Sequence, residues 1–123
     1  MLIKNGLVFR EDFSLREGDV YTEFDRIIEP KQQLDVLDAS GCIVAPGFID
    51  IHIHGANRSD FCENSLEAHA NIARYLASVG VTSYLGTTMA MKKPALLDMV
   101  RTAGKFMDHP IQDGAIMRGI NLE

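Results

Sequence analysis

The sequence predicts an α/β fold, in which a small β-rich unit over residues 1–45 precedes a β-α-β-α-β segment over residues 46–123. Two observations carry this prediction. The first part of the chain contains only short apolar runs separated by polar turns, which is typical of strands. After it, strand-like runs begin near residues 48, 82 and 115, and their spacing of about 33 residues matches one strand-helix unit of a parallel sheet.

Within the small β unit, Asn5-Gly6 is a strong turn signal between two apolar runs. Because both runs are very short, one strand with a bulge at Gly6 is as compatible with the sequence as a hairpin. The alternating run from Val20 to Phe24 predicts a strand that returns at Ile27-Ile28, and residues 34–37 predict another. We expect these strands to form an incomplete, sandwich-like sheet.

Two helices are predicted between the three later strands. The first is expected from about residue 64 to 79, because Asn64 can cap it, Glu67 can complete a capping box, and Gly80 can end it. The second begins at Lys93-Pro94, since proline is tolerated in a first turn. The residues expected on their buried faces are His69, Ile72, Ala73, Leu76 and Val79 in the first helix, and Leu96, Leu97, Val100, Ala103 and Met107 in the second.

The β-α-β-α-β segment is too short to close on itself. A TIM-type (β/α) barrel of eight strands needs about 250 residues, so these 123 residues hold fewer than three of its eight units. The alternatives are a small open sheet and a partial barrel. We expect the partial barrel, which makes the chain an N-terminal fragment.

Composition excludes several classes of partner. The chain has 12 Lys+Arg against 17 Asp+Glu, a net charge of −5, which argues against nucleic acid or an anionic membrane surface. No apolar run approaches the roughly 18 residues that a membrane span requires, and the N-terminus lacks a signal-peptide pattern. The two cysteines are too few to form a disulfide framework. A cytoplasmic protein is expected.

The run from Phe48 to Gly55 carries the main chemical signal. Strand alternation predicts that Asp50, His52 and His54 share one face, while the interleaved isoleucines share the other and pack beneath helices. Polar groups buried against helices would lack partners, whereas the mouth of a barrel accommodates them. A lone histidine on a strand is usually an ordinary core or surface residue. Two at i and i+2 can reach one metal, and neutral imidazole suits zinc or iron.

Glu123 is the third candidate ligand, because it ends the third predicted strand and would lie at the same mouth as His54. Carboxylate oxygens bind or bridge metals held by histidines, although a terminal glutamate is by itself usually solvated. Asn121 shares the face of Glu123, whereas Arg118 is expected on the opposite face, reaching solvent or another subunit.

Other polar residues have weaker claims. His69 is expected to pack or to form a hydrogen bond, and His109 to cap the end of the second helix. Cys62 could line a substrate pocket but is more simply a loop thiol, and Arg58 could face an anionic substrate or be solvated. The hydroxyls of Thr87-Thr88 could contact a ligand or only finish their strand.

Three segments together resemble a known family. Residues 45–55, Ala-Pro-Gly-Phe-Ile-Asp-Ile-His-Ile-His-Gly, resemble the first barrel strand of the amidohydrolase superfamily. Residues 80–88 are similar to the second strand of its N-acetylglucosamine-6-phosphate deacetylases, and residues 119–123 to the start of their Gly-x-His-Leu-Glu-Gly-Pro motif. The sequence departs from this motif at Asn121, where histidine is common.

The resemblance implies a metal-dependent hydrolase that removes the acetyl group from N-acetylglucosamine 6-phosphate, a small amino-sugar phosphate. It also implies that His52 and His54 bind one metal and Glu123 the other or both, giving two divalent ions, Zn²⁺ or Fe²⁺, in a complete homo-oligomeric enzyme. The family's catalytic aspartate, two further histidine ligands and most substrate-binding residues would lie after residue 123, so the chain alone is expected to be inactive.

Two alternatives remain open at this stage. The first is another amidohydrolase, such as a cyclic amidase, an N-acyl amino acid deacylase or an adenine deaminase-like enzyme. The second is a non-catalytic half-barrel that associates with itself or with another polypeptide through its open sheet edge.

Overall fold

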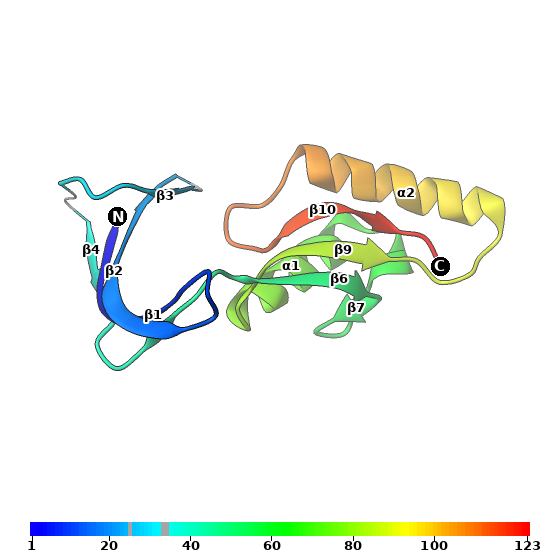
Figure 1. The fold of residues 1–123 in the computed structure, drawn as a ribbon. Coiled ribbons are helices and arrows are strands. Elements are labelled where there is room, and N and C mark those ends of the chain that lie inside the picture. The colour runs from blue at the N-terminus through cyan, green and yellow to red at the C-terminus, as the bar shows by residue number, and fades with distance from the viewer. Residues whose placement is uncertain (25, 33–34) are drawn as a thin grey trace. The chain divides into compact units, whose positions relative to one another are not determined.

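The computed structural model describes residues 1–24, 26–32 and 35–123, which form two compact units, Met1–Pro46 and Gly47–Glu123 (Figure 1). The fold class is α/β, with all the described strands of the first unit in one mixed sheet and a separate parallel sheet in the second unit. None of the described helices is both long and apolar enough to cross a membrane.

The first unit is a small sheet built around its N-terminal strand. β1 pairs antiparallel with β2 and parallel with β4 and β5, and the sheet order is β3-β2-β1-β4. The strands are β1 (Leu2–Phe9), β2 (Leu15–Glu23), β3 (Arg26–Ile28), β4 (Val36–Asp38) and β5 (Ile43–Val44). The return at Ile27-Ile28 is therefore confirmed as β3. In the strand expected at 34–37, Leu34 lies outside the described residues.

Asn5-Gly6 lies inside β1, so the single-strand interpretation is confirmed and the hairpin is wrong. The register between β1 and β2 shifts between Ile3 and Gly6, and Asn5 has φ of 62°. A Cβ atom on Gly6 would lie 2.5 Å from the Val44 side chain. Asn5 adopts the left-handed conformation of the bulge, and the missing side chain of Gly6 leaves room for Val44 of β5.

The second unit has the predicted β-α-β-α-β order, and its three parallel strands lie side by side in the order β10-β9-β6 (Figure 1). Its main elements are β6 (Phe48–Ile53), α1 (Leu66–Ser78), β9 (Val81–Thr87), α2 (Lys93–Asp108) and β10 (Ile116–Asn121). A short hairpin, β7 (Gly55–Ala56) and β8 (Ser59–Asp60), and the 3₁₀ turn η1 (Phe61–Glu63) join β6 to α1.

The N-cap of α1 lies one residue later than expected, at Ser65 instead of Asn64, and the helix begins at Leu66. The Ser65 hydroxyl accepts the backbone N–H of Ala68 at 3.3 Å, while Asn64 adopts a left-handed conformation and ends η1. A capping box does form, but Asp60 and Glu63 build it around η1. An N-cap residue has an extended backbone conformation. Ser65 has this conformation and Asn64 does not, so Ser65 makes the cap.

The core lies between the two helices and the sheet. The predicted face of α1 is buried except at Val79, which is 52% exposed. In α2 the buried side chains are Met99, Ala103 and Phe106, while Leu97, which was expected there, is 42% exposed. Met99, Ala103 and Phe106 follow Leu96 at i+3, i+7 and i+10, so the four residues lie on one face of the helix. Leu97 lies outside this face.

The expected alternation along β6 is interrupted. The register between β6 and β9 shifts between Asp50, which pairs with buried Tyr84, and Ile53, which pairs with Gly86. Paired residues share a face, so Asp50 and Ile53 lie on the same side of the sheet. Ile53 packs against the core as expected.

The expected burial of the other two isoleucines is wrong, because Ile49 and Ile51 are 70% and 66% exposed. The contact pattern gives the physical reason. β6 forms an edge of the described sheet, while α1 contacts β9 and α2 contacts β10. One face of β6 is therefore left uncovered by the helices of this unit.

Candidate metal centre

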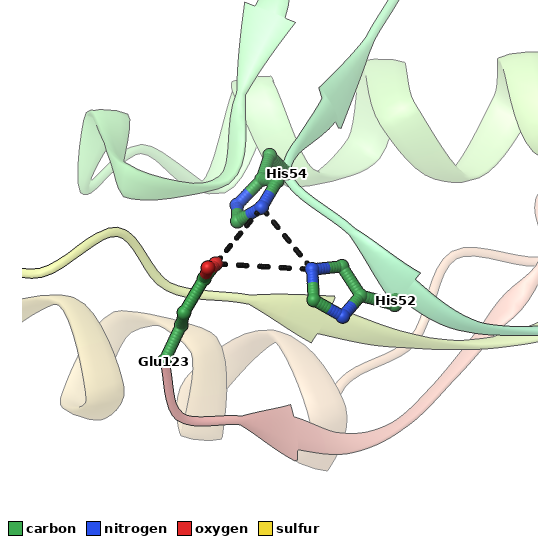
Figure 2. A group of neighbouring side chains, drawn as sticks. All are labelled: His52, His54 and Glu123. Atoms are coloured by element: carbon green, nitrogen blue, oxygen red, sulfur yellow. Dashed lines mark hydrogen bonds and ion pairs between the residues drawn. The ribbon is translucent and has the colours of Figure 1, made fainter.

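Two imidazole nitrogens and one carboxylate oxygen converge at one edge of the parallel sheet. The Nε2 atoms of His52 and His54 lie 3.2 Å apart, and Oε2 of Glu123 lies 3.1 Å from Nε2 of His54 and 3.8 Å from Nε2 of His52. Figure 2 shows the three side chains pointing toward one another, His52 and His54 from the end of β6 and Glu123 from beyond the end of β10. The predicted association of Glu123 with the histidine pair is thus present in the structure.

The parallel sheet brings the three residues together. His52 lies near the end of β6, His54 follows β6, and Glu123 follows β10, so all three occupy the carboxyl edge of the sheet. β9 lies between these strands. Side chains at this edge of parallel strands face a common space, which is where α/β folds place ligands.

The ring of His54 is oriented by a backbone carbonyl. Its Nδ1 lies 3.3 Å from the carbonyl oxygen of Thr87, at the end of β9. A carbonyl oxygen only accepts hydrogen bonds, so this contact requires a proton on Nδ1. The lone pair of neutral His54 is then on Nε2, which is the atom that faces Glu123.

Glu123 is held through its backbone by Thr88. The Glu123 N–H donates to the Thr88 hydroxyl at 3.1 Å, and the Thr88 N–H donates to the Asn121 carbonyl at 3.0 Å. Thr88 is fully buried. Its hydroxyl therefore supports a residue of the centre. The sequence signal for this role was only that a Thr-Thr pair ends the neighbouring strand.

The backbone and the outer ring nitrogen of His52 also make polar contacts. Its backbone N–H donates to Oδ1 of Asp50 at 3.0 Å, and its Nδ1 lies 3.3 Å from the side-chain amide of Asn121. Asp50 thus fixes the backbone of the histidine segment and does not join the converging group. This arrangement agrees with the register shift that separates Asp50 from the two imidazoles.

The donor set fits a divalent metal. The ligand atoms of His52, His54 and Glu123 all lie within 4.8 Å of one another. Ligands about 2.0–2.1 Å from a tetrahedral zinc lie about 3.3 Å apart, close to the separations found here. The side chains are 37–54% exposed, so a metal held by them would remain open to water and substrate.

His69 does not join this group. It is fully buried in α1, with its ring centroid 5.1 Å from Phe61 and 5.7 Å from Phe106. Neither ring nitrogen has a hydrogen-bond partner within the described part of the chain. Burial lowers the pKa of His69, an effect that Glu63 partly opposes. The packing interpretation is confirmed, and the hydrogen-bond alternative is not.

The other candidates lie in ordinary structural positions. His109 follows α2, with Nδ1 3.4 Å from the carbonyl of Lys105, as expected for a residue at a helix end. Cys62 accepts the N–H of Met89 at 3.3 Å, and exposed Arg118 donates to the Ser83 hydroxyl at 3.4 Å. Arg58 is exposed at the tip of the β7–β8 hairpin.

Comparisons with known proteins agree with the resemblance seen in the sequence. N-acetylglucosamine-6-phosphate deacetylase from Bos taurus is 34% identical over 90 residues, which cover 70% of this chain and 22% of the relative. The enzyme of that name from Lysinibacillus sphaericus is 29% identical over 128 residues, covering 100% of this chain and 33% of the relative. A dihydroorotase from Staphylococcus aureus is 40% identical over 58 residues, 43% of this chain and 14% of the relative. No family model matches.

Solved structures share the fold. N-acetyl-D-glucosamine-6-phosphate deacetylase from Mycobacterium smegmatis superimposes with a TM-score of 0.83 at 23% identity, over 100% of this chain and 35% of that one. The enzyme from Thermotoga maritima gives 0.77 at 23% identity, over 99% and 31%. The chain spans about a fifth to a third of the length of the curated deacetylases it matches. The predicted resemblance to deacetylases, over a part of their length, is confirmed.

Proposed function

We propose that this chain forms the N-terminal β unit and the first strands of the barrel of a metal-dependent N-acetylglucosamine-6-phosphate deacetylase. The convergence of His52, His54 and Glu123 carries the proposal, because two strands far apart in sequence supply the donor set of a catalytic metal. The deacetylases among its relatives favour the amino-sugar phosphate as substrate.

The partial barrel is supported by the parallel order of β6, β9 and β10 and by the uncovered isoleucines of β6. In a closed barrel every strand has two neighbours, and side chains fill the interior. Residues 1–45 and 46–123 would then belong to a small β domain and to the hydrolase barrel. A cytoplasmic, homo-oligomeric enzyme is part of the same proposal.

In this proposal His52 and His54 would hold one divalent ion, and Glu123 would hold the second ion or both. A bound Zn²⁺ or Fe²⁺ supplies Lewis acidity and a water whose pKa is lowered toward neutrality. Thr87 and Thr88 keep the His54 ring and the Glu123 backbone in place. No catalytic acid or base is assigned within residues 1–123, because the resemblance places the family's aspartate on a later strand.

Metal analysis tests the ligand assignment. In the full natural chain, the double variant His52→Gln/His54→Asn is expected to lower bound metal from about two ions to about one per chain, because it removes both imidazole donors of one site. Elemental analysis of the purified protein measures this number. His109→Gln is the matched control, since it removes a histidine that lies outside the converging group. Unchanged metal content in the double variant would contradict the assignment.

An acetate-release assay tests the activity. The full natural chain is expected to hydrolyse N-acetylglucosamine 6-phosphate and to lose this activity with a chelator, whereas residues 1–123 alone should show no measurable turnover. Metal-dependent turnover by monomeric residues 1–123 would show that the proposed division of the active site is wrong.

The match to dihydroorotase favours a second candidate, a cyclic amidase. The two candidates share the histidine pair, so the pair cannot separate them. Parallel assays with dihydroorotate and N-acetylglucosamine 6-phosphate do separate them. Turnover of dihydroorotate without acetate release would replace the deacetylase by the cyclic amidase.

A further inference from the structure

Phe61, the first residue of the turn η1, contacts two of the segments that carry the candidate metal centre. Its backbone N–H donates to the carbonyl oxygen of His54 at 2.6 Å. Its ring lies against Gly86 of β9, where an added Cβ atom would overlap the ring and lie 2.6 Å from Cζ. One residue thus contacts the backbone of a candidate ligand and the strand next to it.

These two contacts flank the contact that orients the His54 ring. Nδ1 of His54 lies 3.3 Å from the carbonyl oxygen of Thr87, the residue after Gly86. That distance depends on where the backbones of His54 and Thr87 lie relative to each other. Phe61 holds the first backbone by a hydrogen bond and packs against the residue before the second, so it fixes their separation.

The Phe61 ring is anchored in the core of the second unit. It is 1% exposed, and its centroid lies 5.1 Å from the ring of His69 in α1. It belongs to the same buried cluster as Tyr84 of β9 and Phe106 of α2. Because such a core is closely packed, the ring cannot move away from β9 without opening a void.

Gly86 makes this close approach possible. It pairs with Ile53 of β6 and with Ile120 of β10, so it lies in the middle strand of the sheet. Its backbone does not have the left-handed conformation that requires glycine. The missing side chain at position 86 therefore serves the approach of the Phe61 ring.

The turn that carries Phe61 is itself well fixed. Its capping box consists of the Asp60 carboxylate, which accepts the Cys62 N–H at 2.7 Å, and the Glu63 carboxylate, which accepts the Asp60 N–H at 2.7 Å. Sγ of Cys62 accepts the N–H of Met89, in the segment that follows β9, at 3.3 Å. A shift of the Phe61 side chain would therefore move a turn that contacts the ends of both strands.

We propose that Phe61 is a positioning residue of the metal centre, which holds the backbone of His54 at the end of β9 so that its imidazole meets the other two candidate ligands. The inference rests on the proposed metal centre and deepens it. The Phe61 ring faces the core, so the residue acts on the centre through His54 and Gly86. A centre whose ligands are held in advance binds its metal more tightly.

Phe61→Leu and Phe106→Leu, made in the full natural chain, form a matched pair. Each shortens a buried aromatic side chain that packs on His69, so both should lower the midpoint of urea unfolding. Phe61→Leu is expected to weaken Zn²⁺ binding about 10–100-fold, whereas Phe106→Leu should leave it unchanged. Titration of folded protein with Zn²⁺ against a chromophoric chelator measures both affinities. Equal Zn²⁺ affinities in the two variants would overturn the inference.

Hydrogen exchange in metal-free protein gives a readout that does not depend on the metal. The amide of residue 61 is expected to exchange about tenfold faster in Phe61→Leu than in the wild type, and at the wild-type rate in Phe106→Leu. Equal exchange in Phe61→Leu and the wild type would show that the His54 backbone is held without the ring, which contradicts the proposal. If Phe61→Leu does not fold, Phe61→Met replaces it, since methionine fills a similar space without a rigid ring.

Gly86→Ala tests the same contact from β9. Its methyl group would overlap the Phe61 ring, so this variant should also weaken Zn²⁺ binding. Leucine at position 61 lacks two of the ring atoms that are overlapped, so the combined loss in Phe61→Leu/Gly86→Ala should be smaller than the product of the two single losses. A combined loss equal to that product would mean that the two residues act independently, which contradicts the proposal.

The failure of this inference can be told apart from the failure of the proposed function. If His52→Gln/His54→Asn weakens Zn²⁺ binding but Phe61→Leu does not, Phe61 has no positioning role and the metal centre stands. If the histidine double variant also leaves Zn²⁺ binding unchanged, the metal centre itself is wrong and the role of Phe61 falls with it.

Discussion

Three of the four histidines of this chain occupy two contrasting environments. His69 is fully buried between Phe61 and Phe106, with no partner for either nitrogen in the described residues. His52 and His54 are exposed or half-buried, yet each ring has a polar contact on both nitrogens. The buried histidine therefore has a packing role, whereas the two histidines with polar contacts on both ring nitrogens are the candidates for binding a metal.

The difference follows from what lies around each ring. The interior of the helix layer offers His69 aromatic surface, which favours a neutral ring. The carboxyl edge of the sheet offers His52 and His54 a carbonyl, an amide and a carboxylate. The comparison predicts that removing His69 affects stability and that removing the pair affects metal binding.

The largest expected effect on stability comes from truncating His69. His69→Ala should lower the free energy of unfolding by about 2–4 kcal/mol, because it leaves a cavity between two aromatic rings. His52→Gln/His54→Asn should change it by less than about 0.5 kcal/mol, since both sites are partly exposed. Urea unfolding followed by circular dichroism measures both values. The comparison would break if the double variant destabilised the protein more than His69→Ala.

The second prediction concerns pH. The pKa of His69 in the folded protein is below its ordinary value of 6.5, chiefly because of burial. The unfolded chain therefore takes up the proton first, so the free energy of unfolding is expected to fall as pH drops below about 6.5. Urea unfolding at several pH values, with a chelator present, checks this fall.

His69→Leu serves as the control, because it removes the titrating group and should flatten the fall that begins below about pH 6.5. Hydrogen bonds hold the pKa of Asp12, Asp38 and Asp113 below 3.8. These carboxylates therefore lose their contribution to the free energy of unfolding only at a pH below that at which His69 acts. An equal fall in His69→Leu would mean that another group is responsible.

The smallest expected effect concerns the hydrogen bond from the Glu123 N–H to the Thr88 hydroxyl. Thr88→Val removes the hydroxyl that accepts the Glu123 N–H while keeping the side-chain shape. One lost hydrogen bond corresponds to about 1 kcal/mol, so Zn²⁺ affinity should fall by about fivefold. Thr102→Val, which removes a hydroxyl of α2 that contacts Asn64, is the matched control and should leave the affinity unchanged. Equal affinities in Thr88→Val and the wild type would show that Glu123 needs no such support.

Much of this protein could be predicted from local pattern. The β-branched run 48–53, the helix stop at Gly80 and the proline in the first turn of α2 specify their elements through contacts within a few residues. The histidine pair and Glu123 were also predictable, because parallel strands bring their carboxyl ends to one edge of a sheet.

Tertiary structure decided the features that depend on a neighbouring strand or helix. The register shift beyond Asp50 arises from pairing with β9, and it moves Asp50 away from the histidines that alternation had grouped with it. The buried face of α2 depends on the elements that α2 packs against, and the support from Thr88 and Asn121 depends on the order β10-β9-β6. The physical reason is range: propensity and alternation act over a few residues, whereas register and ring orientation depend on atoms brought close only when the chain has folded.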